Sequence, residues 1–342
     1  MSELQAIAQV IDIHTHIVPE KFPAYTGSVK DIAWPSMSPA PPCHCHVMIQ
    51  GKNYRTVHQS CWINEDRLQD MDAHAVHMQC LSPMPELLSY WLPAKDAQVL
   101  VRFLNDEIAK MVARHPARFT GLGAVPLQDV DMAIRELEYV VRDLKFPGIE
   151  IATHANEVPI GDARFEPFFA AAEKLGAAVF VHALRPIGMD RIVGPVSEQA
   201  MCFPGDIGLA AAGMITGGIA LRHPDLRMAF SHGGGVLSFL IARLNRAWDI
   251  LPKMREALPE APLAYARRFY YDSIVFDPNA LKNIIQTFGA TQVVAGSDFP
   301  FAMGDPDPVK FIRSAGLDEA TERMIFSENA RRFLGKIKMG SE

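Results

Sequence analysis

Residues 10–16 read VIDIHTH, and this stretch joins a strand pattern to two histidines spaced one residue apart. Successive side chains of a strand point to opposite faces, so Ile11 and Ile13 share a face until His14 and Thr15 break the pattern. Where the strand ends, two imidazoles in an H-x-H arrangement can converge on one point. Neutral imidazole is the commonest metal-ligating side chain, so the stretch predicts part of a metal site at the end of a strand.

Short apolar runs and longer amphipathic runs alternate along the rest of the chain. We expect strands over 10–14, 78–82, 119–126, 148–154, 177–182, 226–234, 268–276 and 292–300. We expect helices over 63–74, 94–115, 127–144, 162–176, 205–223, 236–257, 278–289, 307–316 and 319–335. Eight strands, each followed by helix, indicate the α/β class and a (β/α)8 TIM barrel, with residues 1–342 as a single domain.

Residues 20–62 do not fit the repeat and predict an insertion after the first strand. The segments HVMIQG and YRTVH indicate a small β-hairpin with Lys52 and Asn53 near its turn. Loops that follow the strands of a barrel lie on its catalytic face, so we expect the insertion to cover the active site. The stretch CHCH at 43–46 suggests zinc, but structural zinc sites split their ligands into two separated pairs, and alternate strand residues face opposite sides. We therefore expect no metal there.

Composition excludes several classes of protein. The chain has 342 residues, 49% of them hydrophobic, and a formal net charge of −6, which argues against a nucleic-acid-binding protein. No run approaches the length of a membrane span and the first residues do not predict a signal peptide, so we expect no membrane association. Five cysteines are an odd number without a disulfide framework, which predicts a reducing, cytoplasmic setting.

Polar residues gather where the predicted strands end, which is where barrel enzymes carry their chemistry. These residues are His14, His16, Glu150, His154, His182, His232 and Asp298. One histidine at the end of an apolar strand is usually a hydrogen-bonded core residue, but four histidines and an aspartate at one end of a barrel are harder to explain in that way.

Three of these histidines and the aspartate would make a metal site of three nitrogens and one oxygen. His14, His16, His182 and Asp298 leave room for water, as a catalytic zinc site does, although manganese and iron accept the same ligands. No lysine ends the fourth strand, which argues against a bridging carboxylated lysine, so we expect one divalent ion, with zinc as the first choice. Glu150 is the residue that could change this count.

The order HTH, VFVH, SHGGG and GSDFP resembles the amidohydrolase superfamily, and more closely its branch of decarboxylases similar to aminocarboxymuconate-semialdehyde decarboxylase. GKNYR and HGGGVLSFLIARL carry the narrower part of the resemblance. It implies that His14, His16, His182 and Asp298 hold the metal. It also implies that His232 acts as the acid or base, a role that Asp298 could share.

The same resemblance assigns cationic side chains to the substrate. It implies that Arg55 and Arg243 bind carboxylates, that Lys52 is the lysine of the hairpin, and that Arg243 reaches the neighbouring subunit's pocket in a homodimer. After His182 the chain departs from these decarboxylases, which typically carry a tryptophan-containing segment there. Arg185 and Arg191 lie in this segment and are further candidates for carboxylate binding.

Three functions follow as hypotheses. The first is a metal-dependent, non-oxidative decarboxylase of an unsaturated or aromatic carboxylic acid, such as an aminocarboxymuconate semialdehyde or a hydroxybenzoate. The second is a metal-dependent hydrolase of a lactone, amide or ester, because the same ligands serve both reactions. The third, a barrel that only binds small ligands, is disfavoured by the complete ligand set. Arginines aimed at a carboxylate favour the first.

Overall fold

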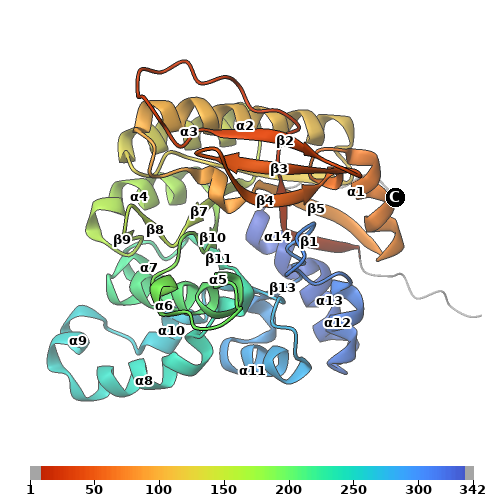
Figure 1. Ribbon diagram of the computed structural model, residues 1–342. Coiled ribbons are helices and arrows are strands. Elements are labelled where there is room, and N and C mark those ends of the chain that lie inside the picture. The colour runs from red at the N-terminus through yellow and green to blue at the C-terminus, as the bar shows by residue number, and fades with distance from the viewer. Residues whose placement is uncertain (1–8, 336–342) are drawn as a thin grey trace, which may run out of the picture.

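The computed structural model describes residues 9–335 and confirms the (β/α)8 barrel (Figure 1). One sheet of eight parallel strands follows the order of the chain: β1 (Val10–Ile17), β5 (Val76–Pro83), β6 (Phe119–Gly123), β7 (Gly148–Ala152), β10 (Ala178–His182), β11 (Arg227–Phe230), β12 (Tyr270–Asp272) and β13 (Val293–Val294). Each predicted strand is therefore present, and most are shorter than their apolar runs.

The segment after β13 closes the sheet onto β1. The amide of Asp298 donates to the carbonyl of His14, and the amide of His16 donates to the carbonyl of Phe299, both at 2.8 Å. The register of β1 against β5 shifts between Asp12 and Thr15, which marks an irregularity in the strand at the H-x-H motif. Closure therefore brings Asp298 beside the two histidines of β1.

Helices surround the barrel. The main ones are α1 (Asn64–Ala73), α2 (Ala94–Arg114), α3 (Val130–Arg142), α4 (Glu166–Leu175), α6 (Phe203–Thr216), α8 (Leu237–Ile250), α11 (Pro278–Phe288) and α12 (Pro308–Ser314). The shorter ones are α5 (Glu198–Met201), α7 (Ile219–Arg222), α9 (Pro252–Ala257), α10 (Pro262–Ala266), α13 (Glu319–Arg323) and α14 (Asn329–Leu334). Within residues 9–335, no helix combines the length and the apolarity that crossing a membrane requires.

Three predicted helices are interrupted. Helix 205–223 divides into α6 and α7 because Gly218 adopts a left-handed backbone with φ of +79°. Helix 236–257 divides into α8 and α9 at Pro252, whose ring removes an amide donor and suits the first turn of a new helix. Helix 319–335 contains a π-helical turn at Met324–Glu328, between α13 and α14.

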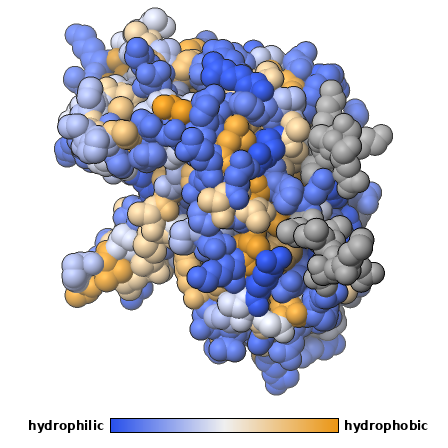
Figure 2. All heavy atoms as spheres, turned by 90° about the vertical axis from the view of Figure 1, so that its right-hand side faces the viewer, coloured by the Kyte–Doolittle hydropathy of each residue, from blue (hydrophilic) through white to orange (hydrophobic). Residues whose placement is uncertain are grey.

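Alternation along the strands divides the core in two. Residues such as Ile149, Ile151, Val179 and Val181 face outward and pack with the helices in the larger apolar cluster. The opposite faces supply a smaller cluster that contains Ile11, Ile13, Met78, Cys80, Leu122, Phe180, Ala229, Val294 and Phe333 of α14. This smaller cluster fills the barrel interior. The outer face that carries α1, α12 and α13 is mostly hydrophilic, with apolar residues scattered over it (Figure 2).

The insertion is a three-stranded antiparallel sheet rather than the predicted hairpin. β3 (His44–Ile49) and β4 (Lys52–His58) form the expected hairpin, turning at Gln50 and Gly51, which both have positive φ. The extra strand, β2 (Pro35–Ala40), pairs with β3. The sequence did not predict this strand because its prolines lack an amide donor and are rare in strands. They are tolerated here because β2 lies at the edge of the sheet. The sheet lies in front of α2 in Figure 1.

Candidate active site

Four potential metal ligands converge at the carboxyl end of the barrel. His14 and His16 extend from β1, His182 ends β10, and Asp298 follows β13. One ligand atom from each lies within 4.8 Å of all the others, and all four residues are buried. The Nε2 atoms of His14 and His16 are 3.0 Å apart, and Nε2 of His16 is 3.1 Å from Oδ1 of Asp298.

The Nδ1 atom of each of these imidazoles has an acceptor of its own. Nδ1 of His14 donates to Oδ2 of Asp272 at 2.6 Å. Nδ1 of His16 donates to the carbonyl of Pro83 at 3.0 Å, and Nδ1 of His182 donates to that of Ala183 at 2.8 Å. In a neutral imidazole, a proton on Nδ1 leaves a lone pair on Nε2. Three lone pairs and a carboxylate therefore face one another.

This donor set fits a divalent cation. Nε2 of His182 and Oδ1 of Asp298 are buried and have no hydrogen-bond partner among residues 9–335. Buried polar atoms are normally paired, and three nitrogens with one carboxylate oxygen are ligands that zinc and related ions accept. Hydrogen bonds from Nδ1 to carboxylate or carbonyl groups are the usual support of metal-ligating histidines. The cluster could therefore hold a metal ion.

The electrostatics of the cluster also favour positive charge. Burial acts to lower the pKa of His14, but the hydrogen bond to Asp272 and the nearby charge of Asp298 raise it to about 9. Burial acts to raise the pKa of Asp298, but the close contact with His16 and the charge of the surrounding imidazoles hold it below its ordinary value. A divalent cation bound to the cluster would balance the negative charge of Asp272 and Asp298, as a proton on His14 does.

Asp272 is a site residue that the sequence analysis did not single out. It ends β12 and is fully buried, and its Oδ1 accepts hydrogen bonds from the amides of Gly233 at 2.8 Å and Ile274 at 3.1 Å. Its Oδ2 is left for His14. The available signal was its position, since Asp272 ends a strand at the same end of the barrel as the other polar residues.

His232 lies beside the cluster, as the sequence analysis predicted. Its ring centre is 5.0 Å from that of His182 and 5.4 Å from that of His14. Burial lowers its pKa. The glycines that follow have a steric role, because a Cβ atom on Gly235 would lie 1.9 Å from the carbonyl oxygen of Pro204. This close approach holds the turn that carries His232.

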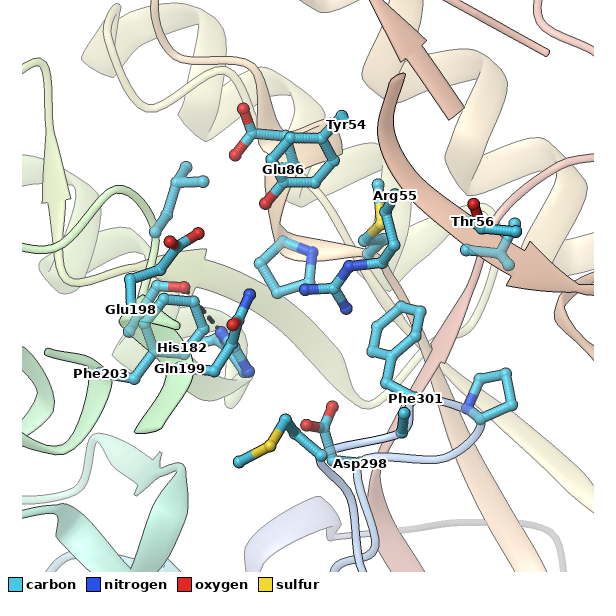
Figure 3. A pocket seen from close by; sticks show the side chains of 18 of the residues that line it. Tyr54, Arg55, Thr56, Glu86, His182, Glu198, Gln199, Phe203, Asp298 and Phe301 are labelled. Atoms are coloured by element: carbon cyan, nitrogen blue, oxygen red, sulfur yellow. Dashed lines mark hydrogen bonds between the residues drawn. The ribbon is translucent and has the colours of Figure 1, made fainter. Parts of the chain in front are cut away.

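A cavity of about 620 Å³ adjoins the cluster, and the insertion forms one of its walls. His182 and Asp298 lie on its inner side, and Tyr54 and Arg55 of β4 lie on the wall (Figure 3). The guanidinium carbon of Arg55 is 4.3 Å from the ring centre of Phe301. Arg55 has no hydrogen bond or ion pair with any residue in 9–335. The cavity therefore contains a cationic group that is free to bind an anion.

Other predicted substrate-binding residues lie elsewhere. Lys52 is exposed at the start of β4, Arg243 is exposed on α8, and Arg191 is exposed in the segment after β10. None of the three lines the cavity. Arg185 does line it, and its guanidinium is bound to Glu86, a buried residue that the sequence analysis missed.

Glu150 and the CHCH stretch are separate from the four converging ligands. Glu150 lies inside the barrel with one carboxylate oxygen 3.7 Å from Nδ1 of His16, on the side of the ring away from the cluster, and burial raises its pKa to about 8. His154 is not one of the four converging ligands either. Its Nε2 donates a hydrogen bond to the backbone carbonyl of Arg185. The one group of potential metal-ligand atoms found in the part of the chain that the structure describes does not include residues 43–46.

The decarboxylases of several organisms are similar to this chain. The 2-amino-3-carboxymuconate-6-semialdehyde decarboxylase of Dictyostelium discoideum is 35% identical over 327 residues, which cover 95% of this chain and 91% of that protein. The gamma-resorcylate decarboxylase of Rhizobium radiobacter is 28% identical, over 80% of this chain and 88% of its own length.

Solved structures give the same picture. A 2,6-dihydroxybenzoate decarboxylase in complex with 2,6-dihydroxybenzoate has a TM-score of 0.71 and 27% identity, covering 80% of this chain and 88% of that one. The 5-carboxyvanillate decarboxylase of Sphingomonas paucimobilis has a TM-score of 0.78 and 25% identity, and the match covers 97% of this chain and 100% of that one. The amidohydrolase family model matches residues 11–336. With three imidazoles and an aspartate at the mouth of its barrel, and a family match over nearly its whole length, this chain belongs to the amidohydrolase family.

Proposed function

We propose that this protein is a metal-dependent, non-oxidative decarboxylase of an unsaturated or aromatic carboxylic acid. The observation that carries the proposal is the convergence of three Nε2 atoms and the Asp298 carboxylate beside a cavity that contains the unpaired Arg55. The similar proteins from Dictyostelium discoideum and Rhizobium radiobacter bear the names of decarboxylases. Aminocarboxymuconate semialdehydes and hydroxybenzoates are accordingly the substrate classes to examine first.

A single divalent ion held by His14, His16, His182 and Asp298 is part of the proposal, with zinc as the first choice. Zinc suits a set of three imidazoles and one carboxylate that leaves a position open, and manganese and iron are the alternatives. When bound there, the ion polarises substrate oxygens and draws electron density from the reacting part of the molecule.

Arg55 orients the substrate in this scheme. Its planar guanidinium can form two parallel hydrogen bonds to a carboxylate, which fixes both the position and the rotation of the acid. The ring of Phe301 supports the guanidinium from one side. Because Arg55 has no competing acidic partner among residues 9–335, its donors are available to the substrate.

His232 supplies the proton. His232 does not line the cavity itself but lies beside the metal-ligand cluster. Nδ1 of His232 lies 3.1 Å from Oγ of Ser231, so Nε2 is the nitrogen left to transfer a proton. Transfer of a proton from Nε2 to the carbon that bears the carboxylate makes that carbon tetrahedral and leaves the adjoining unsaturated system electron-poor. The bond to the carboxylate then breaks, CO2 leaves, and the electron pair returns to the unsaturated system. The proton stays on carbon in place of CO2, and His232 regains a proton from water. Asp298 could share this role.

A homodimer completes the proposal. Arg243 is exposed on α8 and does not line the cavity of its own chain, so it is free to reach the cavity of a neighbouring subunit. α8 lies on the opposite side of the molecule from the insertion in Figure 1. A second arginine delivered in this way would add to the carboxylate-binding capacity of Arg55.

A reducing, cytoplasmic setting is also proposed. All five cysteines lie within the described residues and carry free thiols. Cys61 and Cys80 are buried, and burial raises the pKa of both thiols, which keeps them protonated and unreactive.

The proposal is tested by measuring CO2 release from a panel of acids, with a panel of lactones and esters assayed in parallel. The metal-loaded protein should release CO2 from at least one carboxymuconate semialdehyde or hydroxybenzoate. Hydrolysis of a lactone without CO2 release from any acid would instead establish the hydrolase that the sequence analysis left open.

A further inference from the structure

The wall of the cavity opposite Asp298 contains an ion pair between a buried carboxylate and a half-exposed guanidinium. Glu86 lies in the 3-10 turn Pro85–Leu88 after β5, and only 3% of its surface is exposed. Nε and Nη2 of Arg185 donate to Oε1 of Glu86 at 3.1 and 2.7 Å. In Figure 3, Glu86 lies with Tyr54 on one side of the cavity and Asp298 on the other, with Arg55 between them.

Arg185 is fixed by two further contacts. Its guanidinium carbon lies 3.4 Å from the ring centre of Trp91, which is a close cation–π contact. Its carbonyl accepts a hydrogen bond from Nε2 of His154 at 3.2 Å. Glu86 and Trp91 hold the guanidinium, and His154 holds the backbone of the same residue, so Arg185 has a fixed position before a ligand enters. The pair is therefore a preformed part of the cavity wall.

The two arginines of the cavity differ in their charge balance. Arg55 has no acidic partner within residues 9–335, whereas Glu86 neutralises Arg185. Burying a carboxylate costs free energy unless it is paired and hydrogen-bonded. Glu86 therefore needs Arg185 as its partner, and breaking the pair would be unfavourable. Arg185 is thus poorly suited to be the free carboxylate receptor that the sequence analysis considered. The negative charge of Glu86 offsets the attraction that Arg185 alone would exert on a carboxylate approaching this wall.

We propose that the Glu86–Arg185 pair determines substrate specificity: it accepts an uncharged hydroxyl or amino substituent of the acid and rejects a carboxylate at that position. This inference rests on the proposed function and adds a substrate class to it. Such a substituent can donate to Glu86 and accept from Nη1 of Arg185, which has no hydrogen-bond partner among the described residues. A second carboxylate would instead meet the like charge of the buried Glu86 carboxylate, and such juxtapositions are unfavourable.

Binding of matched aromatic acids to the metal-loaded protein tests this inference without requiring turnover. The probes are two pairs that exchange a hydroxyl for a carboxylate: 3-hydroxybenzoate with benzene-1,3-dicarboxylate, and 4-hydroxybenzoate with benzene-1,4-dicarboxylate. Titration calorimetry should give a preference for the hydroxy acid of about tenfold or more in at least one pair. Equal affinities in both pairs, a preference for the diacids, or no binding of either hydroxy acid would overturn the inference.

Two substitutions with opposite expected effects sharpen the test. Glu86→Gln removes the negative charge with little change of shape, and should reduce the preference at least about fivefold by improving diacid binding. Arg185→Met removes the positive charge from a half-exposed side chain, and should weaken diacid binding further. Glu256→Gln is the matched control, because it removes a carboxylate at an exposed position on α9 that does not line the cavity, and it should leave the preference within about twofold.

The outcomes separate this inference from the proposed function. If acids release CO2 but Glu86→Gln and Arg185→Met leave the hydroxyl preference unchanged, the specificity role is wrong and the decarboxylase remains. If the preference shifts as expected while no acid in the panel loses CO2, the Glu86–Arg185 pair selects substituents as inferred. In that case the proposed decarboxylase reaction is wrong.

Discussion

Nδ1 of His14 donates a hydrogen bond to Oδ2 of Asp272 over 2.6 Å, and both side chains are fully buried. This bond joins the first strand of the barrel to the seventh and fixes the tautomer that presents Nε2 to the other ligands. Two amide donors hold the second oxygen of Asp272, so the carboxylate cannot rotate freely. The geometry of the candidate metal site is therefore supported by a residue that is not one of its four potential ligands.

Asp272→Asn should weaken metal binding about 10- to 100-fold, the range found for supporting carboxylates of this kind. An amide at position 272 no longer provides the anionic acceptor that favours a proton on Nδ1 of His14. Competition with a chelator of known affinity measures the change. Asp277→Asn is the control, because Asp277 caps α11 far from the cluster. Unchanged metal affinity in Asp272→Asn would show that this hydrogen bond does not support the ligand set.

Arg55→Met should raise KM for the carboxylic acid substrate about tenfold or more, because the substrate's carboxylate loses a charged hydrogen-bond partner. The metal content should stay the same, because Arg55 has no contact with the ligands of the cluster. Steady-state CO2 release measures KM, and Arg135→Met, at an exposed position on α3, is the control. A normal KM in Arg55→Met would rule out this arginine as the carboxylate receptor.

His232→Asn should lower kcat about 10²- to 10⁴-fold with KM changed far less, because a positioned proton donor acts in the transition state. Metal analysis of the variant should give the same content as the parent protein. If kcat is retained, the proton that replaces CO2 comes from another group, and Asp298 becomes the candidate.

The ion pairs of Glu166, which lie outside the candidate active site, should make a pH-dependent contribution to the free energy of unfolding. The hydrogen bonds from Arg222 lower the pKa of Glu166, against the opposing effect of burial, and His223 adds to them. A lowered folded-state pKa stabilises the fold above the unfolded value of 4.5, and this stabilisation is lost as the pH falls through the folded pKa.

Chemical unfolding of the parent protein and Glu166→Gln measures this effect. The parent should be more stable at pH 7, and the difference should shrink as the pH is lowered below about 4.5. Glu256→Gln, at an exposed position on α9, should match the parent throughout. A difference between the parent and Glu166→Gln that does not change with pH would contradict the assigned cause.

The sequence was sufficient to predict the barrel, the four converging ligands and the place of His232. These follow from local patterns: apolar runs at regular intervals and polar residues where those runs end. Asp272 and Glu86 could not be assigned in the same way, because their importance comes from contacts with His14 and Arg185 across the barrel. Asp272 also ends a strand, but no local motif shows that either carboxylate is paired.

Irregular backbone was also hard to predict. β2 was missed because proline is rare in strands, although an edge position tolerates it. The division of the predicted helix 205–223 depends on Gly218, and glycine within a helical pattern does not always end the helix. The role of the glycines after His232 is visible only when Pro204 is seen to approach Gly235.

The most direct test of the central claim combines metal analysis with the decarboxylase assay on one preparation of the purified protein. Elemental analysis should give about one divalent metal ion per chain, as expected for a site of three histidines and one aspartate. Chelation should abolish CO2 release, and returning the ion should restore it. A protein that releases CO2 at the same rate with no bound metal would contradict the account.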